Sequence, residues 1–160
     1  MARIKISSVY RFVEVFVDQR VFVGVDVHKK TFSVALLRPD GMIKDWSSPA
    51  DVASLTQILS SLPVHVGAVC YEAGPTGFGL ARNLKAVGIR VIVAAPSHIP
   101  RPITATNKTD SLDCRKLAEL AAAGLIRPIS IPSEREKAFS FSSTPKTSGQ
   151  RFTTKGETKD

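Results

Sequence analysis

Four carboxylates stand where acidic side chains could bind metal ions. Asp26 lies inside an apolar run, Glu72 ends a second apolar run, and Asp110 and Asp113 are three residues apart at the start of a helical pattern. A buried carboxylate without a partner is costly, or it becomes neutral through a raised pKa. Sites rich in oxygen ligands and poor in histidine suit Mg²⁺ or Mn²⁺. Because two such ions can activate an attacking oxygen and stabilise a leaving one at a phosphodiester, the four acids predict metal-dependent chemistry on nucleic acid.

Each acid also has a purely structural interpretation. Asp110 could cap the last predicted helix, and Asp113 could then interact favourably with the helix dipole. Glu72 could be a loop residue at the end of a strand. Asp26 fits such an interpretation least, because an acid inside an apolar strand rarely has only a structural role. The conjunction of all four acids favours the metal site.

Polar residues close to the acids in sequence are candidate nucleic-acid contacts. His28 would share the strand face of Asp26 and could contact metal or substrate, or it could be a solvated histidine at a strand end. Lys29 and Lys108 could contact phosphate, or they could be ordinary surface lysines. The glycine-rich residues 74–79 resemble a phosphate-binding loop only loosely, since the Walker lysine is missing. They are interpreted as a tight turn into a helix.

The elements that must position these residues follow from the apolar pattern. Strands are predicted at residues 21–28, 31–37, 42–46, 64–72 and 89–96, and helices at residues 47–62, 74–88 and 110–124. Residues 39–41 are predicted to form a turn, and Ser47 or Ser48 to cap the first of these helices. This order predicts an α/β fold with a mixed five-stranded sheet and helices on both faces, and a ribonuclease H-like fold has this element order. Asp26 and Glu72 would then meet on adjacent parallel strands.

Actin-like ATPases share the beginning of this element order. They need a second ATPase half, for which 160 residues leave no space. The net charge of +8 favours a polyanionic partner, although the basic residues are scattered.

Several other classes of protein are disfavoured by the composition. No apolar stretch approaches the length of about 20 residues that spans a bilayer, so we expect no membrane association. Charged residues interrupt the first twenty positions, which argues against a secretory signal and for a cytoplasmic protein. Cys70 and Cys114 form no metal-binding or disulfide pattern and are predicted to be packed as small apolar residues.

Three motifs coincide with those of a known family. The segments GVDVHKKTFSVALL, YEAGPTGFGLARNL and NKTDSLDCRKLAELAAAGLIRP, followed by IPSERE, resemble the amino-terminal domain of DEDD-type transposases of insertion-sequence family one-hundred-and-ten. That domain is similar to the RuvC Holliday-junction resolvase. The resemblance implies that Asp26, Glu72, Asp110 and Asp113 form the catalytic tetrad with Mg²⁺. It also implies DNA recombination, a structured guide RNA and a homo-oligomer as in intact family members.

The resemblance covers residues 21–139. Residues 1–20 are predicted to be an amino-terminal extension without a clear packing partner, and residues 140–160 a disordered or out-of-frame tail. Family members continue into a second domain that carries a serine, a role for which neither Ser133 nor Ser140 is expected to serve. We therefore expect a truncated transposase with incomplete strand transfer. The alternatives are a stand-alone RuvC-like structure-specific nuclease and a non-catalytic nucleic-acid-binding fragment.

Overall fold

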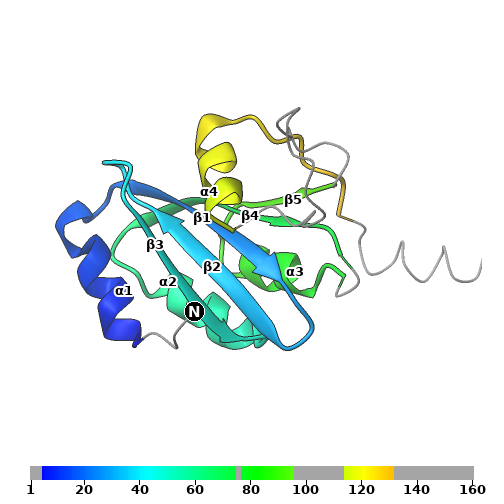
Figure 1. The fold of residues 1–160 in the computed structure, drawn as a ribbon, viewed down its shortest axis with the longest axis horizontal. Coiled ribbons are helices and arrows are strands. Elements are labelled where there is room, and N and C mark those ends of the chain that lie inside the picture. The colour runs from blue at the N-terminus through cyan, green and yellow to red at the C-terminus, as the bar shows by residue number, and fades with distance from the viewer. Residues whose placement is uncertain (1–4, 75–76, 96–113, 132–160) are drawn as a thin grey trace, which may run out of the picture.

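Five strands form one mixed sheet with helices on both faces in the computed structural model (Figure 1). The structure describes residues 5–74, 77–95 and 114–131. The strands are β1 (Arg20–Val27), β2 (Thr31–Leu37), β3 (Ile43–Pro49), β4 (His65–Glu72) and β5 (Val91–Ala94). The helices are α1 (Ile6–Val13), α2 (Val52–Ser60), α3 (Gly79–Ala86) and α4 (Cys114–Ala123), with a short 3₁₀ turn η1 (Glu14–Phe16) after α1.

The sheet order is β3-β2-β1-β4-β5. Strands β1, β2 and β3 are an antiparallel meander, whereas β4 is parallel to β1 and β5 is parallel to β4. The predicted ribonuclease H-like arrangement is therefore confirmed in element order, strand direction and sheet composition. Its consequence for function is that the carboxyl ends of β1, β4 and β5 lie along the same edge of the sheet.

The turn between β2 and β3 forms at the predicted residues. Gly41 has a φ of 89°, in the left-handed region that favours glycine. The backbone N–H of Arg38 donates to the carbonyl of Met42 across the turn, at 2.9 Å. The Pro39-Asp40-Gly41 signal thus sets the register of the hairpin.

The first residue of α2 differs from the prediction. Ser47 and Ser48 are paired with β2 inside strand β3, so neither can cap the helix. Asp51 is the N-cap, and its carboxylate accepts hydrogen bonds from the N–H of Ala53 at 3.1 Å and of Ser54 at 3.4 Å. The serine-cap prediction was wrong because the strand ladder extended three residues further than the apolar pattern.

Side chains alternate between the two faces of the sheet along each strand, and each face carries its own hydrophobic core. Val21, Val23 and Val25 of β1 face α1, α2 and α3, in a core that also contains Tyr71 of β4. Residues of the opposite parity face α4, where Cys70 packs with Leu117. The close-packing predicted for the two cysteines is confirmed, since Cys70 and Cys114 are both fully buried.

Helix α4 lies very close to β1 at Gly24. A Cβ on Gly24 would stand 2.6 Å from the backbone nitrogen of Ala118 and closer still to the carbonyl oxygen of Cys114. Only glycine fits, because backbone atoms cannot move aside as a flexible side chain can. This contact fixes where the first turn of α4 sits on the sheet.

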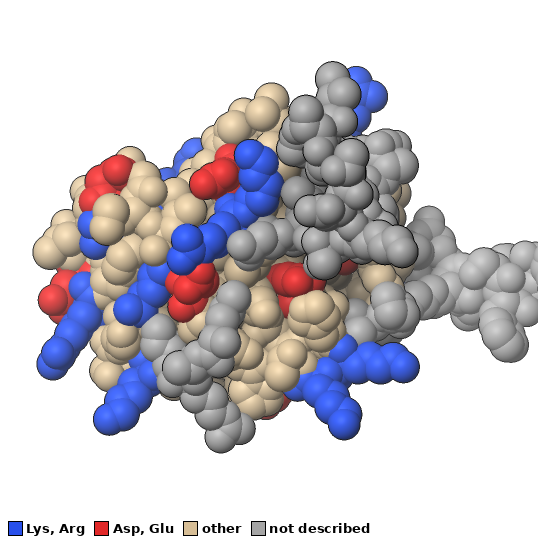
Figure 2. Space-filling model, in the orientation of Figure 1, with Lys and Arg blue, Asp and Glu red and all other residues tan. Residues whose placement is uncertain are grey.

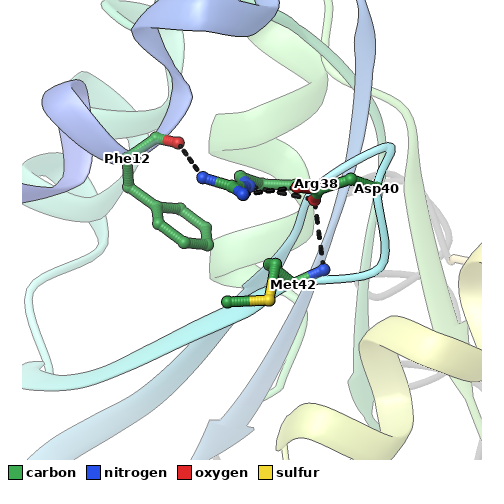
Figure 3. A network of polar contacts seen from close by, with 4 residues as sticks. All are labelled: Phe12, Arg38, Asp40 and Met42. Atoms are coloured by element: carbon green, nitrogen blue, oxygen red, sulfur yellow. Dashed lines mark hydrogen bonds and ion pairs between the residues drawn. The ribbon is translucent and has the colours of Figure 1, made fainter.

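The amino-terminal segment has a packing partner that the sequence did not reveal. Val9 and Val13 of α1 are buried in the same core as the β1 valines. The guanidinium of Arg38 donates to the carbonyl of Phe12 at 3.1 Å and lies 4.4 Å from the centre of the Phe12 ring (Figure 3). Arg38 is itself held by Asp40, which also accepts from the N–H of Met42 at 3.2 Å. The expectation that this segment lacks a partner was therefore wrong.

Within the described residues, no helix combines the length and the apolar character that crossing a bilayer requires.

Candidate metal centre

Asp26 and Glu72 lie at the carboxyl ends of two adjacent parallel strands. The last register pair between β1 and β4 is Val25 with Tyr71, and each acid is the residue that follows. Both acids have the opposite parity to that pair, so both project from the sheet face that α4 covers. The structure thus brings together the two predicted site residues that it describes.

Asp26 is half-buried, with 23% of its side chain exposed. Its Oδ2 lies 3.0 Å from Nε2 of His28, whose side chain is 52% exposed. A backbone hydrogen bond of 3.0 Å from the N–H of His28 to the carbonyl of Thr31 holds this connection tightly folded. His28 therefore contacts the Asp26 carboxylate directly after the end of β1.

Helix α4 begins beside the two acids. The carbonyl oxygen of its first residue, Cys114, faces Gly24, which precedes Asp26 by two on the same strand face. Asp110, Asp113 and Lys108 lie outside the described residues. Among the residues that are described, no three His, Cys, Asp or Glu side chains form a group that could hold a metal ion.

Charged side chains around α4 are paired. Arg115 of α4 forms an ion pair with Asp45 of β3, and Lys116 lies 3.8 Å from Glu119 one turn later. Figure 2 shows acidic and basic side chains next to one another on the face in view. The Arg115–Asp45 pair was not predicted, because its partners are 70 residues apart and no local pattern links them.

Lys29 is exposed and lines a pocket on the other face of the sheet, together with His28 and Tyr71. The pocket was also missed by sequence reasoning. The alternation of side chains along a strand could have indicated it. Val27 and Tyr71 each adjoin one of the two acids in sequence, so their side chains point to the opposite face of the sheet.

The fold is that of the ribonuclease H-like class, with two acids at the carboxyl edge of the central strands. Residues 23–144 match the family model of the IS110-type DEDD transposase domain, which is described as a transposase. The chain belongs to this transposase family. The actin-like alternative is thereby set aside.

Two curated relatives are transposases. The chain is 37% identical over 106 residues to the transposase for insertion sequence element IS1533 of Leptospira borgpetersenii, covering 64% of this chain and 31% of that protein. It is 35% identical over 126 residues to the putative transposase y4qE of Sinorhizobium fredii, covering 75% of this chain and 32% of that protein. The chain therefore spans about a third of the length of the curated relatives it matches.

Solved structures with a similar fold include RuvC from Thermus thermophilus. RuvC in complex with a Holliday junction substrate has a TM-score of 0.45 at 11% identity, covering 69% of this chain and all of that one. A second T. thermophilus RuvC structure has a TM-score of 0.42 at 12% identity, covering 68% and 99%.

Proposed function

We propose that this chain is the acidic metal-binding domain of a transposase and acts on DNA phosphodiesters. The observation that carries the proposal is the placement of Asp26 and Glu72 at matching positions on parallel strands β1 and β4, on one face of the sheet. Carboxylates brought together in this way repel one another unless a cation lies between them. Membership of a family named for its acidic residues supports the same interpretation.

Asp110 and Asp113 complete the proposed ligand set. Asp113 is bonded directly to Cys114, the residue with which α4 begins. The Cys114 carbonyl lies against Gly24, two residues before Asp26 on the same strand. This connection supports the assignment of the later pair to the same site as Asp26 and Glu72.

The four acids fit Mg²⁺ or Mn²⁺ by their chemistry. All four offer oxygen ligands only, and both described acids stand where a shared ion would relieve their repulsion. A bound pair of such ions activates an attacking oxygen and stabilises the leaving oxygen of a phosphodiester. In the proposed site the side chain of His28 orients the Asp26 carboxylate through its 3.0 Å contact. Lys29 and Lys108 contribute positive charge for the phosphate backbone.

The proposed substrate is DNA. We expect that complete strand transfer also needs a region corresponding to the parts of the relatives that this chain does not match. The relatives are about three times as long as the matched segment, so complete recombination is proposed for a larger protein. A structured guide RNA and a homo-oligomer are further expectations from the family resemblance.

Calorimetric titration of the purified chain with Mn²⁺ tests the metal site. We expect wild-type binding, and at least tenfold weaker binding in Asp26→Asn, Glu72→Gln, Asp110→Asn and Asp113→Asn, because each variant removes a charged ligand. Asp18→Asn is the matched control, since Asp18 is exposed and its positive φ of 62° is well tolerated by asparagine. Unchanged titration in Asp26→Asn would contradict the assignment.

Strand cleavage distinguishes the remaining functions. A domain that cuts branched DNA with metal, without any partner domain, would be a stand-alone nuclease. Salt-sensitive binding of DNA that survives loss of all four acids, without cleavage, would indicate a non-catalytic binding fragment.

A further inference from the structure

The sheet face that α4 covers has an apolar half and a polar half. On β4 and β5, the residues of this face are buried with α4 in one core: Ala68, Cys70, Ile92 and Ala94. On β2 and β3, the same face carries Thr31, which is exposed, and Ser33 and Ser47, which are half-buried. Each of these three adjoins a residue of the opposite core in sequence, either Phe32 or Trp46, so its side chain points to the α4 side.

Asp26, Ser33 and Ser47 form one row across three neighbouring strands. Ser33 is the register partner of Asp26, and Ser47 is the register partner of Ser33. Directly opposite residues of antiparallel strands have Cα atoms about 4.5–5.5 Å apart, so the row extends about 10 Å from Asp26 to Ser47. The two serines therefore lead from the first acid of the proposed metal site to the edge strand β3.

The hydroxyls of Ser33 and Ser47 form no hydrogen bond within the part of the chain that the structure describes. Other serine hydroxyls near the sheet and in α2 do have protein partners. The hydroxyl of Ser48 donates to the carbonyl of Pro49 at 3.3 Å, and that of Ser54 donates to Asp51 at 2.6 Å. Because a serine hydroxyl is a donor as well as an acceptor, the two hydroxyls of the row can each donate to an anionic oxygen.

Basic side chains stand on both sides of the row. Lys29 and Lys30 are exposed in the connection between β1 and β2, just beyond the acid. On the other side, Arg115 of α4 forms an ion pair with Asp45, which precedes Ser47 by two on the same face of β3. The polar half of the face is thus set between cationic groups.

This surface fits the backbone of a nucleic-acid strand. Serine, threonine, lysine and arginine are common contacts of phosphate and sugar. An apolar partner would leave the two hydroxyls without hydrogen bonds, which is unfavourable. Stacked bases need aromatic platforms, and the only aromatic residues of β2 and β3 are Phe32 and Trp46 in the opposite core. The expected contacts are therefore to phosphates and not to bases.

We infer that the DNA strand bound at the acids continues over β2 and β3 on the α4 side of the sheet, where its backbone contacts Ser33 and then Ser47. The alternative direction, over β4 and β5, meets a face whose described residues are buried beneath α4. The inference rests on the proposed function for the phosphate at Asp26, and it adds the direction in which the strand leaves the site.

Binding of a labelled single-stranded DNA oligonucleotide to the full chain in EDTA tests the inference. Ser47→Asp should weaken binding roughly tenfold, because its carboxylate would repel a neighbouring phosphate. Ser48→Asp is the matched control: it adds the same charge one residue away on the opposite face, and it should bind like wild type. Ser33→Ala should weaken binding about two- to tenfold through the loss of one hydrogen bond.

The salt dependence gives a measurement with the opposite sign. Ser47→Lys should steepen the slope of log K against log salt by about 0.7, the contribution of one added phosphate contact to a single strand. Ser48→Lys should leave the slope unchanged. Because a misfolded chain does not gain a phosphate contact, a steeper slope in Ser47→Lys alone cannot arise from unfolding.

A further pair of variants connects the path to the acids. In EDTA, Asp26→Asn should tighten binding about two- to tenfold, because a negative charge beside the strand is removed. Asp18→Asn removes the same charge before the opposite end of β1 and should leave the affinity unchanged, since salt screens distant surface charges.

Equal binding by Ser47→Asp and Ser48→Asp overturns the inference, and so does wild-type affinity in Ser33→Ala. Equal affinity of Asp26→Asn and Asp18→Asn would overturn it as well, because the strand would then not pass the acid. A chain that does not bind the oligonucleotide has the same consequence. The proposed function fails separately: absence of Mn²⁺ binding would remove the metal site and leave the measurements in EDTA standing.

Discussion

Gly24 of β1 faces the carbonyl oxygen of Cys114, so the first turn of α4 rests directly on the strand that carries Asp26. Backbone of helix and backbone of strand meet there without a side chain between them. The position of α4 on the sheet depends on this contact. Any side chain at residue 24 must displace the helix from the sheet.

Gly24→Ala should therefore destabilise the domain. The added methyl would overlap backbone atoms of Cys114 and Ala118, and overpacking of this kind costs about 1–3 kcal/mol or more. Urea unfolding measures the loss. Gly79→Ala is the control, because a Cβ there meets no atom within 4 Å, and its free energy of unfolding should stay within about 0.5 kcal/mol of wild type. Equal stability of Gly24→Ala and wild type would mean that α4 is not seated as described.

Arg38 should hold the amino-terminal helix on the domain. Its guanidinium donates to the Phe12 carbonyl and lies beside the Phe12 ring (Figure 3). It lies 4.4 Å from the centre of the Phe12 ring and 4.8 Å from the centre of the Phe16 ring. Arg38→Ala should lower the thermal midpoint and speed proteolysis between α1 and β1, because these contacts are lost. Arg11→Ala, an exposed arginine of α1, removes the same charge and should change neither measurement. Cleavage at the wild-type rate in Arg38→Ala would show that the buried valines alone hold the helix.

The Asp51 cap should make stability depend on pH in the acid range. Hydrogen bonds from the Ser54 side chain and backbone and from the Ala53 N–H hold the pKa of Asp51 below its usual value. A carboxyl with a lowered folded pKa stabilises the fold above its unfolded pKa of about 3.9 and loses that effect as pH falls through the folded value. Asp51→Asn keeps a cap but cannot titrate. The stability difference between wild type and Asp51→Asn should therefore shrink below about pH 4, as thermal melts across that range would measure. A difference that is constant with pH would contradict the cap.

The sequence predicted most of the fold because its strands are apolar runs separated by clear turn residues. The placement of Asp26 and Glu72 at one sheet edge could also be predicted, because neighbouring parallel strands end on the same side of a sheet. The sequence missed what depends on tertiary contact. Ser47 and Ser48 are residue types that often cap helices, but both are paired with β2 inside strand β3 and precede the helix by several residues. Val9 and Val13 formed a pattern too short to interpret, because the valines that pack against them belong to β1. The bond from Arg38 to the Phe12 carbonyl likewise joins residues that are 26 positions apart.

The two cysteines should report the docking of α4. Cys70 of β4 is buried beneath α4, and Cys114 is buried in the first turn of α4 itself. Burial raises the pKa of the Cys70 thiol to about 12. Since alkylation requires an exposed thiolate, both should react with iodoacetamide far more slowly in the native chain than in urea at pH 8. Gly24→Ala should raise the native rate at both cysteines by the same factor, because one displaced helix uncovers both. Acceleration at Cys114 alone would indicate fraying of the first turn of α4, while acceleration at neither would leave the helix docked despite the added methyl.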